Sequence, residues 1–376
     1  MNRIVILHFA PLELYPPIQN LIRLLELKND SKKIFVFTTH TNVDVLKEFD
    51  SHSEKTKIIH LGISGQKLGK IKRYSSYLFY YVGSLIYLIL KRPAAIFYYE
   101  TISSYPAYLY KRFFNSKVQL FIHYHEYTSP TEYINGTGLT RYFNLCEKYL
   151  YQRAKWVSHT NEYRMQKFIE DISPTKILNP KILPNYPPAS WFKIPRQKNT
   201  LPVKAVYVGA LSINTMYVKE FAEWVLAQNG KIEWHIYSYN ITTDTKIYLK
   251  SLESEQIVIK EGVNYDELPL LLKQYDIGII LYKGHIENYI YNAPNKLFEY
   301  LANGLDVWLP NNMKGSLSYV TNKVYPKVIS VDFTQLDKFD FDEAINKEGY
   351  VISTNTYYCE QALAPIAEAL LIKSTD

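Results

Sequence analysis

The stretch NAPNKLFEYLANGLDVWL, residues 292–309, contains a complete helix-to-strand connection and is the most informative part of the chain. Pro294 suits the first turn of a helix, where its missing N–H group costs nothing. Apolar residues then recur at helical spacing, and Gly304 stands where a helix should end. The stretch therefore predicts a helix over 295–302, followed by a strand over 305–309.

Two charged residues lie three positions apart on one side of this predicted helix, Lys296 and Glu299. A helix start with free N–H groups, beside Asn295 and Lys296, favours an anion such as a phosphate. A carboxylate one turn later can accept two hydroxyl groups of a ribose. A surface helix with a Lys–Glu pair is the alternative, and the spacing alone leaves both open.

Short apolar runs alternate with helical stretches on both sides of this connection. The expected strands lie at 3–9, 34–37, 57–61, 95–99, 118–122, 156–158, 182–183, 203–208, 232–237, 256–260, 276–282 and 305–309. Continuous apolar strands separated by helices indicate parallel sheets covered on both faces. The pattern predicts an α/β fold of two doubly wound, Rossmann-like domains that face a cleft.

Five prolines between residues 184 and 202 interrupt the alternation and mark a linker. We therefore expect an N-terminal domain over 1–185, a linker over 186–202 and a second domain over 203–355. Residues 356–376 form a final helix, which we expect to pack back on the first domain.

The composition is that of a folded protein, with 47% hydrophobic and 21% charged residues among 376. Cys146 and Cys359 have no Cys or His neighbours at metal-ligand spacing, so a disulfide scaffold or a structural zinc site is not expected. Residues 1–185 carry 25 Lys and Arg against 14 Asp and Glu, a net charge of +11, whereas residues 186–376 carry −4. A basic half suits nucleic acid, an anionic membrane or solvent, and no nucleic-acid recognition motif is present.

Residues 74–90 carry no charge and follow a basic cluster of Lys70, Lys72 and Arg73. The segment has 17 residues, whereas a membrane span needs about 20. We expect a helix packed on a sheet; a helix that also contacts a membrane interface and a true span remain alternatives. We expect no targeting signal at the start of the chain.

The run from Pro294 to Gly304 resembles the donor-binding signature of GT-B glycosyltransferases, especially the family 4 group that includes capsule and lipopolysaccharide enzymes. Their pattern reads Pro-x-Lys-x-x-Glu-Tyr, then a small residue, Gly and a strand. It corresponds here to Lys296, Glu299 and Tyr300 between Pro294 and Gly304. Other family-like stretches follow in the expected order, at 123–126, 161–164, 183–187, 207–211, 261–269 and 275–279.

The resemblance implies how a nucleotide-diphosphate sugar would be bound. Glu299 would bind the donor ribose, Lys296 and Asn295 would hold the diphosphate, and Gly209 would let the backbone approach the phosphates. Further donor contacts are expected at Ser212, Tyr237, Val263, Tyr291 and Asn292. A UDP- or GDP-sugar is the expected donor, and neither a cofactor nor a metal ion is expected.

The expected catalytic residues are His125 and Glu126, which follow the predicted strand 118–122. Ligands bind at the strand ends of such sheets. His8 and His123 are weaker candidates. The sequence also departs from the family pattern. Tyr291 stands where family 4 enzymes often have a second glutamate, which leaves the sugar and the stereochemical outcome open.

The resemblance as a whole implies a retaining, metal-independent glycosyltransferase of surface polysaccharide synthesis, acting on a glycan or lipid-linked acceptor. We expect it in the cytoplasm, held peripherally on the inner membrane face by Lys70, Lys72 and Arg73. A nucleotide-sugar epimerase with the same architecture and a degenerate, non-catalytic glycan- or partner-binding protein are the alternatives.

Overall fold

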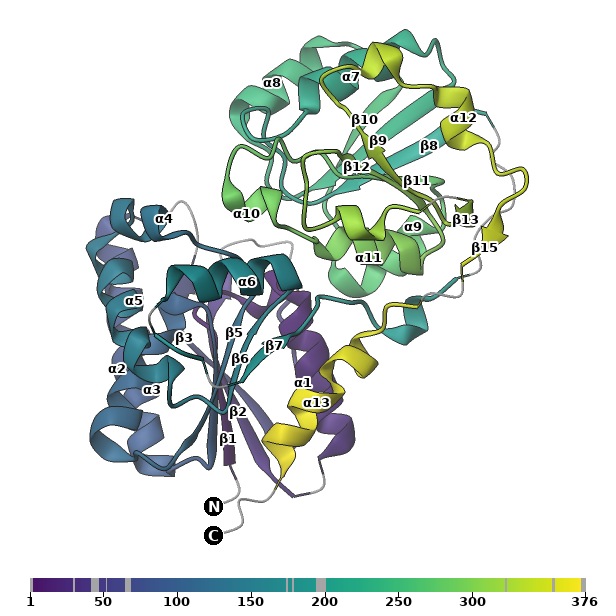
Figure 1. Ribbon diagram of the computed structural model, residues 1–376. Coiled ribbons are helices and arrows are strands. Elements are labelled where there is room, and N and C mark those ends of the chain that lie inside the picture. The colour runs from purple at the N-terminus through teal and green to yellow at the C-terminus, as the bar shows by residue number, and fades with distance from the viewer. Residues whose placement is uncertain are drawn as a thin grey trace. The chain divides into compact units, whose positions relative to one another are not determined.

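The structure is a computed structural model. It describes residues 3–29, 31–41, 47–51, 53–64, 69–173, 175–177, 179–193, 201–321, 323–353 and 356–372. The chain divides into two compact units (Figure 1). Unit 1 comprises Met1–Asn185 and Cys359–Asp376, and unit 2 comprises Tyr186–Tyr358.

Unit 1 is built on a parallel sheet of seven strands. Their order is β3-β2-β1-β4-β5-β6-β7, so the direction of winding reverses between β1 and β4. Such a reversal opens a crevice at the carboxyl ends of the strands. The strands are β1 (Arg3–Leu7), β2 (Lys33–Thr41), β3 (Thr56–Ser64), β4 (Ala95–Tyr99), β5 (Gln119–Tyr124), β6 (Trp156–His159) and β7 (Pro180–Ile182).

Helices cover both faces of this sheet (Figure 1). One face packs on α2, α3 and α5, whose buried side chains include Tyr80, Ala107 and Leu150. The other carries α1 and the chain's last helix, α13, which Lys32 ties down by donating from Nζ to the Leu370 carbonyl at 2.8 Å. The helices are α1 (Pro16–Lys28), α2 (Lys70–Lys91), α3 (Ser104–Leu109), α4 (Pro130–Asn135), α5 (Gly138–Tyr151), α6 (Glu162–Asp171) and α13 (Cys359–Leu371).

Unit 2 repeats this plan with a six-stranded parallel sheet of order β10-β9-β8-β11-β12-β14. Its winding reverses between β8 and β11. A short parallel pair, β13 with β15, lies outside this sheet. The strands are β8 (Val203–Val208), β9 (Ile232–Ser238), β10 (Ile257–Glu261), β11 (Ile277–Ile279), β12 (Asp306–Pro310), β13 (Val324–Tyr325), β14 (Val328–Val331) and β15 (Val351–Ile352).

Two separate apolar cores lie on the two faces of the unit 2 sheet. One contains Phe221, Trp234 and Trp308 and packs under α7, α8 and α12. The other contains Phe298 and Tyr300 and packs under α9 and α11. The helices are α7 (Val218–Ala227), α8 (Thr243–Ser251), α9 (Leu268–Leu272), α10 (Glu287–Ile290), α11 (Asn295–Ala302) and α12 (Phe341–Ile345).

One close contact fixes α11 against the sheet. A Cβ atom added to Gly278 of β11 would lie 2.1 Å from the ring of Tyr300, so only glycine leaves room for this ring. The Val208 N–H donates to the Tyr300 hydroxyl at 3.1 Å. The two contacts hold the last turn of α11 against β11 and the end of β8.

The structure confirms the predicted α/β class with two Rossmann-like parallel sheets, and α11 has the predicted bounds. Residues 186–193 of the expected linker are part of unit 2, where Trp191 is buried against Tyr265; residues 194–200 lie outside the described part. The strand expected at 276–282 is shorter, because the chain leaves the sheet after Ile279. Among the described helices, none is long and apolar enough to cross a membrane.

Candidate functional site

The ammonium group of Lys296 lies at the carboxyl end of β8, directly over Gly209. Its Nζ donates to the hydroxyl groups of Tyr207 at 3.2 Å and Tyr282 at 3.4 Å. Nζ also lies 4.4 Å and 5.2 Å from the centres of these two rings. A Cβ atom on Gly209 would come within 3.0 Å of Nζ, and the φ of +132° at Gly209 disfavours any other residue. Tyr207, Tyr282 and Gly209 therefore surround the ammonium group, and we call this arrangement the Lys296 cage.

The charge of Lys296 persists in this cage. Burial opposes the charge, but the hydroxyl groups of Tyr207, Tyr282 and Tyr300 outweigh burial and hold the pKa of Lys296 above its ordinary value. No side chain caps the N-terminus of α11, whose N-cap residue is Pro294. A cation and an uncapped helix start thus meet at the winding reversal of unit 2, a combination that favours an anion.

Glu299 follows one turn later and is buried, with 8% of its surface exposed. Burial raises the pKa of its carboxyl group to about 7, against the opposing effect of Lys296. Among the described residues, its carboxylate oxygens have no hydrogen-bond partner, whereas its backbone carbonyl accepts from Asn303 at 2.8 Å. Such a carboxylate is available to accept hydroxyl groups of a ligand.

The other residues predicted to bind the donor are less closely grouped. Gly209 and Asn295, the first residue of α11, lie with the Lys296 cage. Ser212 lies in the turn after β8, where its hydroxyl accepts from the Asn214 N–H at 3.4 Å. Tyr237 points into the core, with its hydroxyl 2.9 Å from that of Tyr275.

Three more predicted donor residues lie in loops of unit 2. Val263 follows β10 and packs against the core under α11. Tyr291 ends α10, and its carbonyl leaves no room for a Cβ atom at Gly315. The carbonyl of Asn292 accepts from the Ser316 hydroxyl at 2.7 Å. None of the contacts just named involves Lys296.

In unit 1, His125 follows β5 and is almost fully buried. Its Nδ1 lies 3.3 Å from Oδ1 of Asn185, a contact that assigns the ring proton to Nδ1. Burial lowers the pKa of His125 to about 3, so the ring is neutral near pH 7. Its Nε2 is buried and has no hydrogen-bond partner among the described residues. A neutral imidazole with an unused acceptor nitrogen suits a ligand hydroxyl or a proton transfer.

A carboxylate that the sequence prediction missed, Glu100, positions the backbone around His125. Its Oε1 accepts from the backbone N–H groups of His125 at 2.6 Å and Glu126 at 3.2 Å. Burial and the nearby Glu126 raise the pKa of Glu100 to about 8. The backbone of Glu100 has φ 61° and ψ 152°, a region that is essentially restricted to glycine and costs on the order of 1–3 kcal/mol. Strain of this kind concentrates at functional sites.

Two further histidines at strand ends have unpartnered ring nitrogens. His8 follows β1 and His159 ends β6, and both nitrogens of each ring are buried with no partner among the described residues. Burial lowers the pKa of both. His123 differs, because its Nδ1 lies 2.9 Å from the Ser158 hydroxyl. Glu126 is exposed, unlike His125 beside it. We use the name histidine group for His8, His125 and His159 together with Glu100, the carboxylate that holds the His125 backbone.

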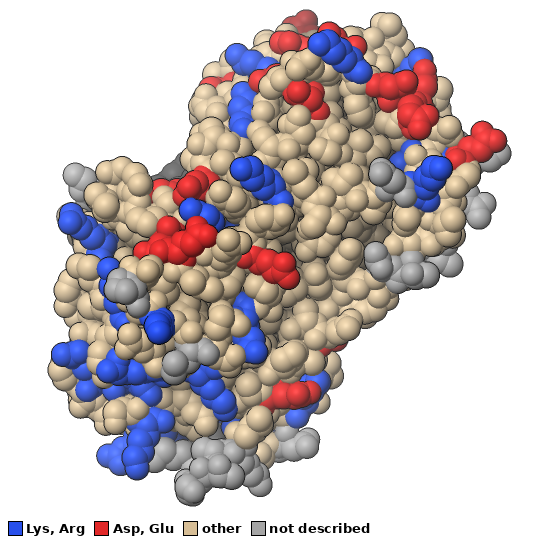
Figure 2. Space-filling model, viewed as in Figure 1, with Lys and Arg blue, Asp and Glu red and all other residues tan. Residues whose placement is uncertain are grey.

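The basic residues predicted to face a membrane lie in the first turn of α2. Lys72 and Arg73 are exposed, and the side chain of Lys70 lies outside the described part of the chain. Figure 2 shows Lys and Arg side chains gathered over the side of unit 1 where α2 and α3 lie.

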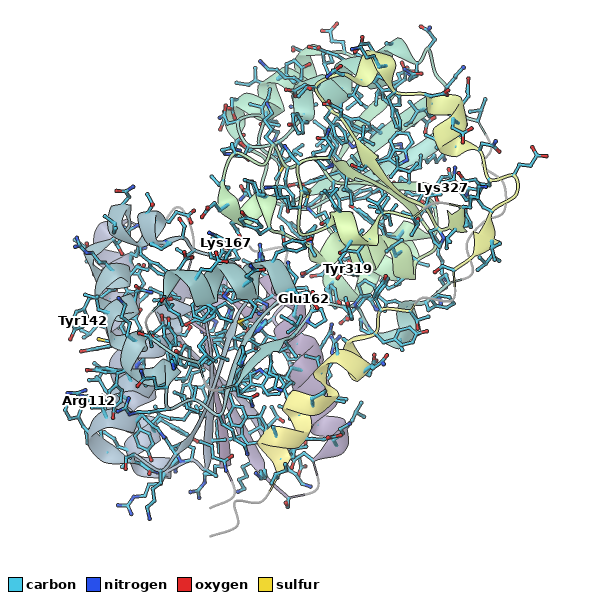
Figure 3. The ribbon with its side chains drawn as sticks, in the orientation of Figure 1. Arg112, Tyr142, Glu162, Lys167, Tyr319 and Lys327 are labelled. Carbon is cyan, nitrogen blue, oxygen red and sulfur yellow. The ribbon has the colours of Figure 1, made fainter. Side chains whose placement is uncertain are left out.

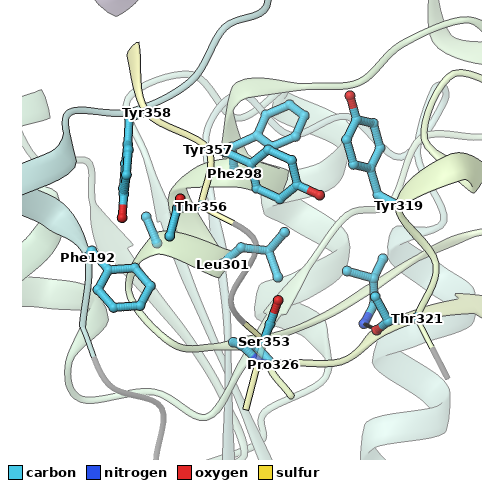
Figure 4. Close-up of a pocket in the computed structure, with 12 residues that line it drawn as sticks. Phe192, Phe298, Leu301, Tyr319, Thr321, Pro326, Ser353, Thr356, Tyr357 and Tyr358 are labelled. Carbon is cyan, nitrogen blue, oxygen red and sulfur yellow. Dashed lines mark hydrogen bonds between the residues drawn. The ribbon is translucent and has the colours of Figure 1, made fainter. Parts of the chain in front are cut away.

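Unit 2 also contains a pocket behind α11 (Figure 4). Its walls are mainly aromatic and aliphatic, and none of the described residues that line it carries a charge. By helix geometry, Phe298 and Leu301 point into it from the opposite side of α11 to Lys296. The pocket therefore lacks the charge that a diphosphate requires. The lining includes Phe192, Phe298, Leu301, Tyr319, Tyr357 and Tyr358.

No known family profile matches the sequence, and no curated protein matches it either. Solved structures do match over nearly the whole chain. Sucrose-phosphate synthase from Thermosynechococcus elongatus superposes with a TM-score of 0.68 at 12% identity, covering 99% of this chain and 95% of its own. HepE from Anabaena, solved with UDP and glucose, gives 0.59 at 11% identity, covering 99% and 96%. The UDP-GlcNAc 2-epimerase from Neisseria meningitidis, solved with UDP-GlcNAc, gives 0.58 at 13% identity, covering 99% and 100%.

These structural similarities identify the fold of the chain. The chain has the GT-B fold, with two Rossmann-like domains, as the sequence predicted. At such low identity the likeness establishes the fold alone. Because transferases and an epimerase share it, the residues of the two sites must decide the activity.

Proposed function

We propose that the protein is a glycosyltransferase that binds a nucleotide-diphosphate sugar at the carboxyl edge of the unit 2 sheet. The caged ammonium group of Lys296 over Gly209, at the start of α11, carries this proposal. In this pose, the phosphates lie against Lys296 and the α11 N–H groups, and Glu299 accepts the ribose hydroxyl groups. The structures of HepE with UDP and glucose and of the epimerase with UDP-GlcNAc show that proteins of this fold bind such donors.

Transfer breaks the bond between the anomeric carbon and the phosphate oxygen and forms a bond from that carbon to an acceptor oxygen. The bonding electrons leave with the diphosphate, whose negative charge grows in the transition state. Lys296 and the start of α11 are fixed in place before this charge develops, and preorganised charge of this kind lowers the barrier. We therefore propose that no metal ion is needed and that UDP- or GDP-sugars are the donors.

The histidine group of unit 1 is proposed to bind the acceptor hydroxyl. The unused Nε2 of His125 accepts a hydrogen bond from the acceptor hydroxyl, and Glu126, the exposed carboxylate of the same loop, takes the hydroxyl proton as the new bond forms. Glu100 is a positioning residue, because it holds the backbone of both. Transfer with retention, as family 4 resemblance implies, is checked by NMR of the anomeric proton in the product.

An exposed apolar stripe along α2 supports a membrane-bound acceptor. Side chains at helical spacing face solvent, between 46% and 85% exposed: Ile71, Tyr74, Leu78, Phe79, Val82, Ile86 and Leu90. Exposed Lys72, Arg73, Lys91 and Arg92 flank them. Arg112 and Tyr142 lie on the same outer side of unit 1 (Figure 3). A stripe of this kind with basic ends suits a peripheral helix on an anionic membrane, and we propose that the acceptor is a lipid-linked glycan at that surface.

A donor screen tests the proposed function. The full-length protein is heated with UDP-, GDP-, ADP- and CMP-sugars, and a bound donor raises the melting temperature by mass action. We expect one nucleotide class to stabilise the wild type but not Lys296→Ala. No stabilisation by any of them, or equal stabilisation of the variant, would contradict the proposal.

An epimerase is the second candidate, because the Neisseria enzyme has the same fold. The two activities differ in their need for an acceptor. Incubation with a donor labelled in the sugar separates them: an epimerase releases the label in a second sugar without an acceptor, whereas a transferase moves it only to an added acceptor.

A further inference from the structure

A second group of histidines lies on unit 1, away from the strands that carry the histidine group. His40 is near the end of β2 and His60 is in β3, and these two strands pair in parallel at the edge of the sheet. The register places Thr38 opposite His60 and then shifts, so that His40 stands opposite Ile63. Glu48 follows from the segment 47–51.

These three side chains meet at close range. Nδ1 of His40 lies 2.8 Å from Oε1 of Glu48. The rings of His40 and His60 stack with their centres 4.3 Å apart and 15° between their planes. One possible ligand atom from each of the three residues lies within 4.8 Å of the other two.

A local hydrogen bond accounts for only part of this arrangement. The pair of His40 and Glu48 is satisfied by its own contact. His60 is not, because its Nε2 is buried and has no hydrogen-bond partner among the described residues. A buried nitrogen with an unused bonding position destabilises the fold unless something occupies it. A cation ligated by all three residues would use it.

We propose that His40, Glu48 and His60 bind one divalent transition-metal ion of the Zn²⁺ class, with a water molecule as fourth ligand. Two imidazoles and one carboxylate are the donor set that such ions select, whereas Mg²⁺ and Ca²⁺ prefer oxygen ligands alone. The site belongs to unit 1 and does not depend on the proposed sugar transfer.

The two stacked rings must turn before both can bind one ion, because an imidazole nitrogen binds a metal in the plane of its ring. Ligand atoms about 2.1 Å from a tetrahedral zinc ion lie about 3.4 Å from one another. The three atoms, which lie within 4.8 Å of one another, must therefore close by up to about 1.4 Å. The side chains of His40 and Glu48 are 47% and 55% exposed, so their rotamers can adjust without repacking the core. The bound ion would tie the end of β2 and segment 47–51 to β3.

Metal titration of the full-length protein tests the site. Chelator-treated protein is titrated with Co²⁺, whose visible absorption reports a four-coordinate site with nitrogen ligands, and the Co²⁺ is then displaced with Zn²⁺. We expect one equivalent to bind, with affinity at least 100-fold weaker in His40→Ala and His60→Ala and about tenfold weaker in Glu48→Gln. His285→Ala, which removes an exposed histidine of unit 2, is the matched control and should bind as the wild type does.

A stability measurement separates lost ligation from lost folding. Without metal, His40→Ala should melt within a degree or two of the wild type, because the side chain is half exposed. Zn²⁺ should raise the melting temperature of the wild type and of His285→Ala, but not of His40→Ala. Absence of binding to the wild type, or equal binding by wild type, His40→Ala and His60→Ala, would overturn the proposal.

Discussion

The carboxyl edges of the two sheets differ in the charge that they present, although both sheets reverse their winding after the third strand in spatial order. Unit 2 holds a permanent cation there, Lys296, in a cage of tyrosine hydroxyl groups. Unit 1 holds neutral imidazoles, among them His125, beside the strained Glu100. One unit thus carries a fixed charge at this edge of its sheet, and the other carries neutral groups that can accept hydrogen bonds.

This difference suggests a division of labour. A fixed cation stabilises charge on a phosphate, whereas a neutral imidazole accepts a hydrogen bond from a hydroxyl group but adds no charge. We infer that unit 2 binds and activates the donor and that unit 1 handles the acceptor. Substitutions in one unit at a time separate the two roles.

Removal of the fixed charge should have the largest effect. Lys296→Ala is expected to lower turnover about 100-fold, or about 2.7 kcal/mol of barrier, because the leaving diphosphate loses a preorganised donor. Steady-state transfer assays measure this loss. Lys283→Ala is the matched control, since Lys283 lies in the same unit but pairs with Glu220 at 3.1 Å. Equal turnover of the two variants would remove Lys296 from the site.

Removal of the imidazole should cost less. His125→Ala is expected to lower turnover at least tenfold, about 1.4 kcal/mol, while nucleotide affinity stays near the wild-type value. Turnover should fall without a change in nucleotide affinity, because His125 belongs to unit 1 and would act on the acceptor. A comparison of kcat with nucleotide Kd checks it, with His285→Ala as control. Loss of nucleotide binding equal to the loss of turnover would assign His125 to the donor instead.

Glu299 should set a pH dependence of donor affinity. Burial raises the pKa of its carboxyl group to about 7, and only the carboxylate accepts two ribose hydroxyl groups. The protonated form dominates below that pKa, so affinity for a nucleotide sugar should fall as the pH drops from 8 to 6. Glu299→Gln should bind about tenfold more weakly at pH 8 and show a flat profile. The same slope in Glu299→Gln would exclude this carboxylate as the cause, and Glu287→Gln on α10 is the matched control.

The surface charges of unit 1 should have the smallest effect. Neutralising Lys70, Lys72 and Arg73 is expected to weaken binding to anionic vesicles roughly threefold to tenfold, and salt should weaken the wild type in the same way. Vesicle sedimentation measures both. Neutralising three exposed lysines of unit 2, Lys204, Lys246 and Lys250, removes the same charge and should have no comparable effect. If vesicle binding changed neither on neutralisation of these residues nor on addition of salt, the result would contradict a membrane role for the start of α2.

The sequence predicted the fold and the position of α11 because both rest on local patterns. Apolar runs located most strands, and the proline and glycine around 292–304 located α11. Gly278 could not be interpreted in this way, because its role depends on the ring of Tyr300 packing onto it in three dimensions. The tyrosine cage of Lys296 was missed for the same reason. Tyr207 lies at the end of β8 and Tyr282 follows β11, so only the folded chain brings them to Lys296.

Glu100 shows a different limit of sequence-based prediction. It directly follows the predicted strand 95–99, so inspection of every strand end would have found it. Its positive φ, however, cannot be predicted from a glutamate, which ordinarily avoids that region. The helices α5 and α6 were also missed, and they carry Glu147 and Arg164 into the core of unit 1. The predicted cleft between the domains stays a prediction.

Calorimetric titration of the wild type and Lys296→Ala with a nucleoside, its monophosphate and its diphosphate tests the central claim most directly. If Lys296 and the start of α11 hold the diphosphate, wild-type affinity should rise at least tenfold from nucleoside to diphosphate, and this rise should largely vanish in the variant. An equal rise in both proteins, or no preference for the diphosphate in the wild type, would contradict the account.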